Sequence, residues 1–165
     1  MRTARFPFWT KNKKMLINQN YIKINVEAAD CFQAIEAAAS PLLRDNRIDE
    51  GYITAACERE KIFPTGLPTP VGVAIPHAEP DNVLEEAVSL ITLKNPVVFH
   101  GMGAPEECID VSIVFLLAIK DGEKQIETLQ KIVLMIQDEM VLQKIAGAKN
   151  PEWIYNLVKD IDGLD

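Results

Sequence analysis

The spacing of apolar residues along this chain predicts five helices. From residue 123 to residue 138, apolar side chains recur every three or four positions, which places them on one side of a helix. The same spacing marks four further segments, residues 28–43, 49–60, 139–146 and 152–158. Asp49 is a suitable N-cap for the second helix, because its carboxylate can accept hydrogen bonds from the first free backbone N–H groups. Arg59 and Glu60 then fall at the C-terminal end of that helix.

Short apolar runs between these helices predict strands. The weak alternation of apolar and polar residues over 21–24 is typical of a first strand. In the last expected strand, residues 111–119, Ser112 is the one polar residue. The remaining strands are expected at residues 71–75, 87–93, 97–99 and 111–119. A nearly continuous apolar run is typical of a central strand that is covered on both faces. Residues 63–70 contain three prolines and one glycine and are expected to form a loop.

Strands that alternate with helices predict a single α/β domain, with helices on both faces of a mixed β-sheet. The 165 residues are 48% hydrophobic, which is enough for one substantial core. We expect residues 1–14, which are basic and aromatic without a clear period, to form a flexible N-terminal extension, and residues 15–165 to form the domain. No apolar run approaches the roughly 20 residues that span a bilayer, so we expect no membrane insertion.

Charge and cysteine content exclude several classes of function. The net charge of −7 argues against nucleic-acid binding, which usually requires a basic surface. Cys31, Cys57 and Cys108 form no Cys-x-x-Cys pair and no metal-ligand pattern with the two histidines. We expect them to be buried free thiols in a reducing cytoplasm, and we expect no metal and no cofactor, because nucleotide-binding loops are also missing from the sequence.

His77 is the residue best suited to chemistry. It follows Pro76, which ends the expected strand because proline lacks the N–H that a strand ladder needs. Reactive groups of α/β sheets commonly lie just beyond a strand end. A neutral imidazole is a nucleophile near pH 7, and the guanidinium of Arg59 offers a planar fork of donors to phosphate. Taken without its motif, a lone histidine is more often a structural or surface residue.

Several segments of the chain together resemble enzyme IIA of the bacterial sugar phosphotransferase system, of the fructose/mannitol type. In order, they are Arg59-Glu60, Pro64-Thr65-Gly66, Gly72-Val73-Ala74-Ile75-Pro76-His77-Ala78, Pro96-Val97-Val98-Phe99 and Val114-Phe115-Leu116-Leu117-Ala118. The resemblance extends from about residue 20 to about residue 160. Phe63-Pro64-Thr65-Gly66, together with Gln125, is most similar to the galactitol-type members.

The resemblance implies a cytoplasmic phosphoryl carrier without a cofactor. Such a carrier accepts a phosphoryl group from the phosphocarrier HPr, here on His77, and passes it to a cysteine of enzyme IIB, which serves the membrane enzyme IIC. Galactitol or a related polyol is the substrate that the resemblance suggests. The alternative is a regulatory relative of the nitrogen-regulatory type, which acts by binding its targets according to its phosphorylation state.

The resemblance also assigns roles to individual residues. Arg59 matches the family arginine that contacts the phosphoryl group, and Thr65 is a further candidate in the glycine-containing turn. Fructose and mannitol members have a second histidine at the position of Gln125, whose amide can orient a phosphate or an imidazole but cannot carry a proton. His100 matches no motif and is expected to be a structural residue in a surface turn, and Glu60 is expected to be structural.

Overall fold

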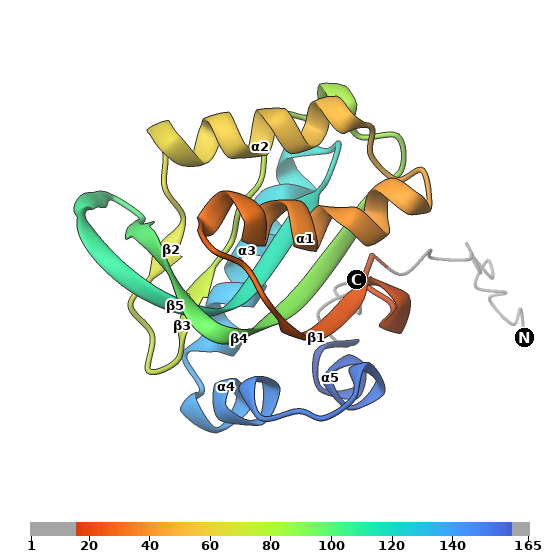
Figure 1. Ribbon diagram of the computed structural model, residues 1–165. Coiled ribbons are helices and arrows are strands. Elements are labelled where there is room, and N and C mark those ends of the chain that lie inside the picture. The colour runs from red at the N-terminus through yellow and green to blue at the C-terminus, as the bar shows by residue number, and fades with distance from the viewer. Residues whose placement is uncertain (1–15, 160–165) are drawn as a thin grey trace, which may run out of the picture.

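A five-stranded mixed sheet separates two groups of helices in the computed structural model, which describes residues 16–159 (Figure 1). The strands are β1 (Ile22–Val26), β2 (Gly66–Leu67), β3 (Gly72–Ala74), β4 (Ala87–Gly101) and β5 (Ala104–Ala118). The helices are α1 (Cys31–Arg44), α2 (Glu50–Ile62), α3 (Gly122–Ile136), α4 (Glu139–Ala146) and α5 (Pro151–Val158), and the short 3-10 turns are η1 (Gln19–Tyr21) and η2 (Pro80–Asn82). The α/β class predicted from the sequence is confirmed.

The long hairpin of β4 and β5 forms the centre of the sheet. These two strands are antiparallel along most of their length, while β1 runs parallel to β4 and β3 runs parallel to β5. The tip of the hairpin curves back toward β2, where Gly66 pairs with Gly101 and the N–H of Met102 donates to the Gly66 carbonyl at 2.8 Å. This curvature brings the hairpin tip close to the chain segment that enters β2.

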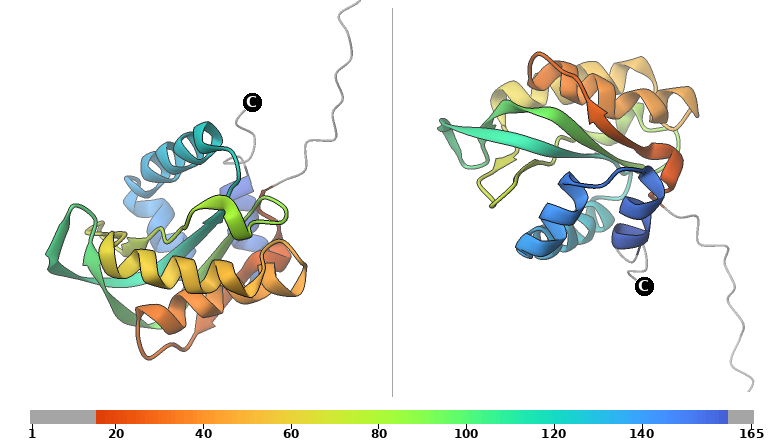
Figure 2. Two further views of the ribbon diagram at one scale, coloured as in Figure 1. Left: turned by 90° about the horizontal axis from the view of Figure 1, so that it is seen from above. Right: turned by 60° about the horizontal axis from the view of Figure 1, so that its bottom comes forward.

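Both faces of β5 are buried, as expected for a central strand. Val114 and Leu116 face the core beneath α1 and α2, whereas Ile113, Phe115 and Leu117 face the core covered by α3, α4 and α5. Figure 2 shows the two helical groups on opposite sides of the sheet. Alternate side chains of one strand therefore contribute to two separate cores, which fixes the position of β5.

Each of the five α-helices within residues 16–159 begins at an acidic or amide residue. The capping side chains accept hydrogen bonds from backbone N–H groups in the first turn, and they belong to Asp30, Asp49, Asp121, Asp138 and Asn150. The prediction of Asp49 as an N-cap is confirmed. Each such cap contributes about 1 kcal/mol to helix stability, so the helix starts are marked in the sequence itself.

The strands are longer than their apolar runs predicted. The expected strands 87–93 and 97–99 form one strand, β4, in which the register shifts between Thr92 and Val97 around exposed residues. β5 begins at Ala104 instead of residue 111, because the polar residues of the hairpin still pair along the ladder. The expected loop 63–70 contains the short strand β2, whose ladder tolerates the flanking prolines.

Two expectations about single residues are wrong. His100 lies within β4, opposite Cys108, because the turn of the hairpin comes at Met102 and Gly103. The three cysteines are free, but Cys108 is exposed and the other two are only half-buried.

The expected extension of residues 1–14 lies outside the described residues. Between residues 16 and 159, no helix is long and apolar enough to cross a membrane, and no cluster of three metal-ligating side chains is found.

The close approach of β3 to β5 gives a test of the fold. A Cβ atom added at Gly72 would lie 2.0 Å from the backbone oxygen of Asp110. Gly72→Ala should therefore lower the free energy of unfolding by about 1–3 kcal/mol, measured by urea denaturation. Gly122→Ala is the matched control, because a Cβ there meets no atom within 4 Å and should leave stability unchanged or slightly raised. Equal stability of Gly72→Ala and the unmodified chain would contradict the close strand packing.

Candidate functional site

His77 lies three residues beyond the end of β3, at the point where the chain leaves the sheet. Pro76 ends the strand, and the N–H of Leu117 in β5 donates to the Pro76 carbonyl at 3.2 Å. His77 forms an isolated parallel bridge with the same Leu117. The central strand therefore holds the histidine in place although β3 itself has ended.

The imidazole of His77 has one nitrogen bound to the backbone. Nδ1 lies 2.8 Å from the carbonyl oxygen of Ile75. Because a carbonyl can only accept a hydrogen bond, Nδ1 must carry the proton in the neutral ring, and Nε2 then has a free lone pair. This geometry leaves Nε2 as the ring nitrogen that could act as a nucleophile.

A surface pocket of about 470 Å³ contains His77, Arg59 and Thr65. It is enclosed by the end of α2, the segment that follows this helix, the hairpin tip and α3. The remaining lining residues are apolar or glycine, namely Ile62, Phe63, Pro64, Met102, Gly103, Pro105 and Leu129. Three of the four predicted site residues are thus brought together, although Arg59 and His77 are 18 positions apart in the sequence.

Arg59 is available to bind an anion in this pocket. Its guanidinium carbon lies 5.2 Å from the centre of the Phe63 ring, which orients the half-buried side chain. Within residues 16–159, Arg59 takes part in no ion pair. A guanidinium that is held by an aromatic ring and has no carboxylate partner can direct its donors at phosphate oxygens.

The pocket lowers the pKa of His77 below its ordinary value of 6.5. Burial is the largest cause, since it penalises the charged imidazolium, and the positive charge of Arg59 acts in the same direction. The hydrogen bond to Ile75 and the charge of Glu79 oppose this effect without reversing it. His77 is therefore neutral at pH 7, as a nucleophile must be.

The hydroxyl of Thr65 is engaged within the fold, although Thr65 lines the pocket. It donates to Oε2 of Glu60 at 2.9 Å and accepts from the N–H of Ile75 at 3.2 Å. With both contacts made, this hydroxyl binds α2 to the residue that precedes Pro76.

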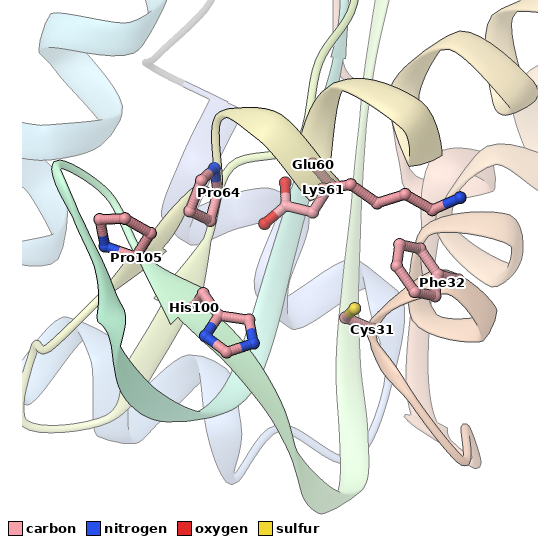
Figure 3. A pocket seen from close by; sticks show the side chains of 7 residues that line it. All are labelled: Cys31, Phe32, Glu60, Lys61, Pro64, His100 and Pro105. Carbon is pink, nitrogen blue, oxygen red and sulfur yellow. The ribbon is translucent and has the colours of Figure 1, made fainter.

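Gln125 and His100 lie outside this pocket. Gln125 is in the first turn of α3, and this helix reaches the pocket with Leu129 instead, one turn later. His100 lines a separate cavity of about 310 Å³ together with Cys31 and Glu60 (Figure 3). The structure therefore does not bring the two histidines into one site.

Tyr52 is a residue that sequence reasoning missed. Its hydroxyl, at the buried side of α2, donates to the carbonyl of Leu117 and accepts from the N–H of Ala78 at 3.1 Å. Burial raises the pKa of Tyr52 to about 12, so the hydroxyl stays protonated. The sequence indicates only that Tyr52 is buried and that its hydroxyl must therefore have hydrogen-bond partners. It does not indicate which residues these are, because they are distant along the chain.

Comparison with known proteins gives one family. The family model described as "Phosphoenolpyruvate-dependent sugar phosphotransferase system, EIIA 2" matches residues 15–161. The mannitol-specific phosphotransferase enzyme IIA component of Staphylococcus aureus strain Mu50 is 28% identical over 150 residues, which cover 89% of this chain and 97% of that protein.

Two solved structures have the same fold. Enzyme IIAMtl of Escherichia coli, in complex with phosphorylated enzyme IIBMtl, gives a TM-score of 0.69 at 22% identity and covers 86% of this chain and 96% of that chain. The nitrogen regulatory protein IIA-Ntr of Neisseria meningitidis gives a TM-score of 0.70 at 20% identity, with coverage of 87% and 96%. At these identities the likeness concerns the fold alone.

The lowered pKa of His77 predicts a pH dependence of stability. Because the ring titrates below 6.5 in the folded chain, the unfolded chain takes up this proton first as the pH falls. The contribution of His77 to the free energy of unfolding is therefore present above pH 6.5 and decreases as the pH falls toward the folded-state pKa. NMR titration of the His77 ring, assigned by comparison with His77→Ala, measures the folded-state value directly. A midpoint at or above 6.5 would contradict this description of the pocket.

Proposed function

This chain belongs to the EIIA type 2 family of the phosphoenolpyruvate-dependent sugar phosphotransferase system, and on that basis we propose that His77 carries its phosphoryl group. Members of this family are phosphotransferases that carry phosphoryl groups on histidine. The chain has two histidines. The observation that carries the proposal is that His77, and not His100, shares a pocket with Arg59 and has a free Nε2.

The geometry supports the following transfer. The Nε2 lone pair of His77 attacks the phosphorus of a donor phosphohistidine, the donor N–P bond breaks, and its electron pair returns to the donor ring. Arg59 stabilises the charge on the equatorial oxygens, and the Ile75 carbonyl stabilises the positive charge that the His77 ring gains. In the second step, an acceptor thiolate attacks the phosphorus and the bond to Nε2 breaks.

The proposed partners are HPr as donor and enzyme IIB, linked to the membrane enzyme IIC, as acceptor, in the cytoplasm. Exposed apolar side chains on the pocket rim support docking of a protein: Ile62 is 69% exposed, Phe63 61% and Met102 43%. The complex of the Escherichia coli neighbour with phosphorylated enzyme IIBMtl supports an acceptor of this kind.

The finer proposal is that the system transports a polyol, with galactitol as the leading candidate. The sequence motif Phe63-Pro64-Thr65-Gly66 and the glutamine at position 125 support galactitol as the transported substrate. The similarity to a mannitol-specific protein supports a hexitol. The alternative is a regulator of the nitrogen-regulatory type. Its support is the shared fold, and no contact in the His77 pocket favours it over transport.

The acceptor residue is tested by phosphorylation in a purified system. Incubation with phosphoenolpyruvate, enzyme I and HPr should add one phosphoryl group that is labile in acid and stable in alkali, measured by intact-protein mass spectrometry. His77→Ala should remove the modification because His77 is the imidazole among the described residues that line the pocket, while His100→Ala should retain it. Labelling of His77→Ala at the wild-type level would refute the proposal.

The same phosphorylated protein separates transport from regulation. When mixed with the enzyme IIB encoded beside a polyol transporter, a carrier should lose its phosphoryl group to a cysteine of that protein. A regulator would retain the group and would bind a target outside transport with an affinity that depends on phosphorylation. Failure of transfer to every polyol enzyme IIB would remove the polyol proposal, and failure with every enzyme IIB together with binding of such a target would remove the transport proposal.

Arg59 is tested by a substitution that keeps its charge. Arg59→Lys loses the planar fork of donors, so the transfer barrier should rise by about 1–3 kcal/mol, which is a roughly 5- to 150-fold slower rate in rapid-quench measurements. Arg44→Lys is the control, because Arg44 is an exposed residue of α1 outside the pocket. An unchanged transfer rate in Arg59→Lys would mean that the guanidinium geometry contributes nothing to the reaction.

A further inference from the structure

We propose that Glu60 is a positioning residue, which fixes the imidazole of His77 through Thr65 and Ile75. The proposal rests on the proposed function in so far as His77 is the phosphoryl acceptor. Glu60 does not line the pocket that contains His77, and faces the separate cavity beside His100 (Figure 3). The hydrogen bonds between them give Glu60 a route to the imidazole, and its charge also acts on Arg59.

Both carboxylate oxygens of Glu60 are engaged by one residue. The N–H of Thr65 donates to Oε1 at 2.8 Å, and the Thr65 hydroxyl donates to Oε2 at 2.9 Å. The side chain is only 6% exposed. A buried carboxylate is costly unless hydrogen bonds compensate it, and burial raises the pKa of Glu60 while the two bonds from Thr65 oppose that rise. These two hydrogen bonds hold Thr65 in a fixed position relative to the C-terminal end of α2.

The next link joins Thr65 to the strand that leads to His77. The N–H of Ile75 donates to both the hydroxyl and the carbonyl of Thr65, at 3.2 and 3.3 Å. Since the Thr65 hydroxyl uses its proton for Glu60, a lone pair is available to receive this N–H. Glu60 therefore determines which way the Thr65 hydroxyl is oriented.

The last link is the one that matters for chemistry. The carbonyl of Ile75, the same residue whose N–H is held by Thr65, accepts from Nδ1 of His77 at 2.8 Å. This bond selects the neutral tautomer with a free Nε2 and keeps the ring directed into the pocket. A shift of Ile75 would allow the other tautomer, in which Nδ1 becomes the nucleophile.

Removing the charge of Glu60 should disturb this link without unfolding the chain. In Glu60→Gln, the amide NH₂ replaces one of the two acceptors, so either the Thr65 N–H or the Thr65 hydroxyl loses its acceptor, and the support of Ile75 is weakened. The fold retains other attachments at this point, since Ile75 also donates to the Thr65 carbonyl and Tyr52 holds Ala78 on the far side of His77.

The test compares five variants of the full chain with two readouts. The variants are Glu60→Gln, Thr65→Val, Thr65→Ser, the double variant Glu60→Gln/Thr65→Val, and the control Glu58→Gln. Glu58 is an exposed carboxylate of the same helix that pairs only with Lys61 among the described residues. The first readout is the rate of phosphorylation by phosphorylated HPr. The second is the 15N NMR spectrum of the His77 ring, which reports the tautomer before phosphorylation and the modified nitrogen after it.

We expect Glu60→Gln and Thr65→Val each to slow phosphorylation by roughly 10- to 100-fold and to show mixed tautomers and mixed phosphorylated nitrogens. Thr65→Ser should recover most of the rate lost in Thr65→Val, and the double variant should be no slower than either single variant because both act through one chain of bonds. Glu58→Gln should retain the wild-type tautomer and rate.

A folded Glu60→Gln protein with the wild-type rate and a single Nδ1-protonated tautomer would overturn the proposal. If Glu60→Gln does not fold, the comparison of Thr65→Val with Thr65→Ser decides in its place, and equal tautomers in these two variants would overturn it. If the unmodified chain is not phosphorylated, the proposed function fails, while the tautomer of His77 in the same variants still tests the positioning role.

Discussion

The pairing of the β3 segment with β5 is the constraint on which the candidate site depends. β5 is packed into a core on each face and cannot shift without disturbing both. Gly72 and Ala74 pair with this strand, and the contact continues past the strand end through Pro76 to Leu117. A histidine on an irregular segment thus has the positional accuracy of a central strand, which a loop alone would not provide.

Helix α2 supplies the groups that complete the site. Arg59 and Glu60 follow Tyr52 by seven and eight positions, which is about two turns of helix. The three side chains therefore lie on neighbouring sides of one rigid element. Tyr52 holds the chain after His77, Glu60 and Thr65 hold the chain before it, and Arg59 enters the pocket itself. The positive charge at the C-terminal end of the helix is also favoured by the helix dipole. One helix therefore carries both the support of the proposed acceptor and the charge that would balance its phosphate.

The features that sequence reasoning predicted are those with local causes. The start of α2 depends on the Asp49 cap, and the place of His77 depends on Pro76, both of which are visible within a few residues. The polar half of the β4–β5 hairpin was missed because its ladder is maintained by a partner strand and not by its own apolar pattern. The partners of Tyr52 were missed for the same reason, since Leu117 is 65 residues away.

The difference between Gln125 and Leu129 bears on how the site can work. Motif alignment put a polar residue of α3 at the acceptor, whereas the helix presents Leu129 to the pocket. Among residues 16–159, the ionisable groups that line the pocket are then His77 and Arg59. Two such groups are sufficient for transfer between nitrogen and nitrogen or sulfur. A neutral imidazole attacks and a neutral imidazole leaves, so no proton has to be supplied or removed at the reacting nitrogen. An apolar side chain in place of a second acid–base group is consistent with the proposed transfer, because neither step needs a further proton donor or acceptor at the reacting nitrogen.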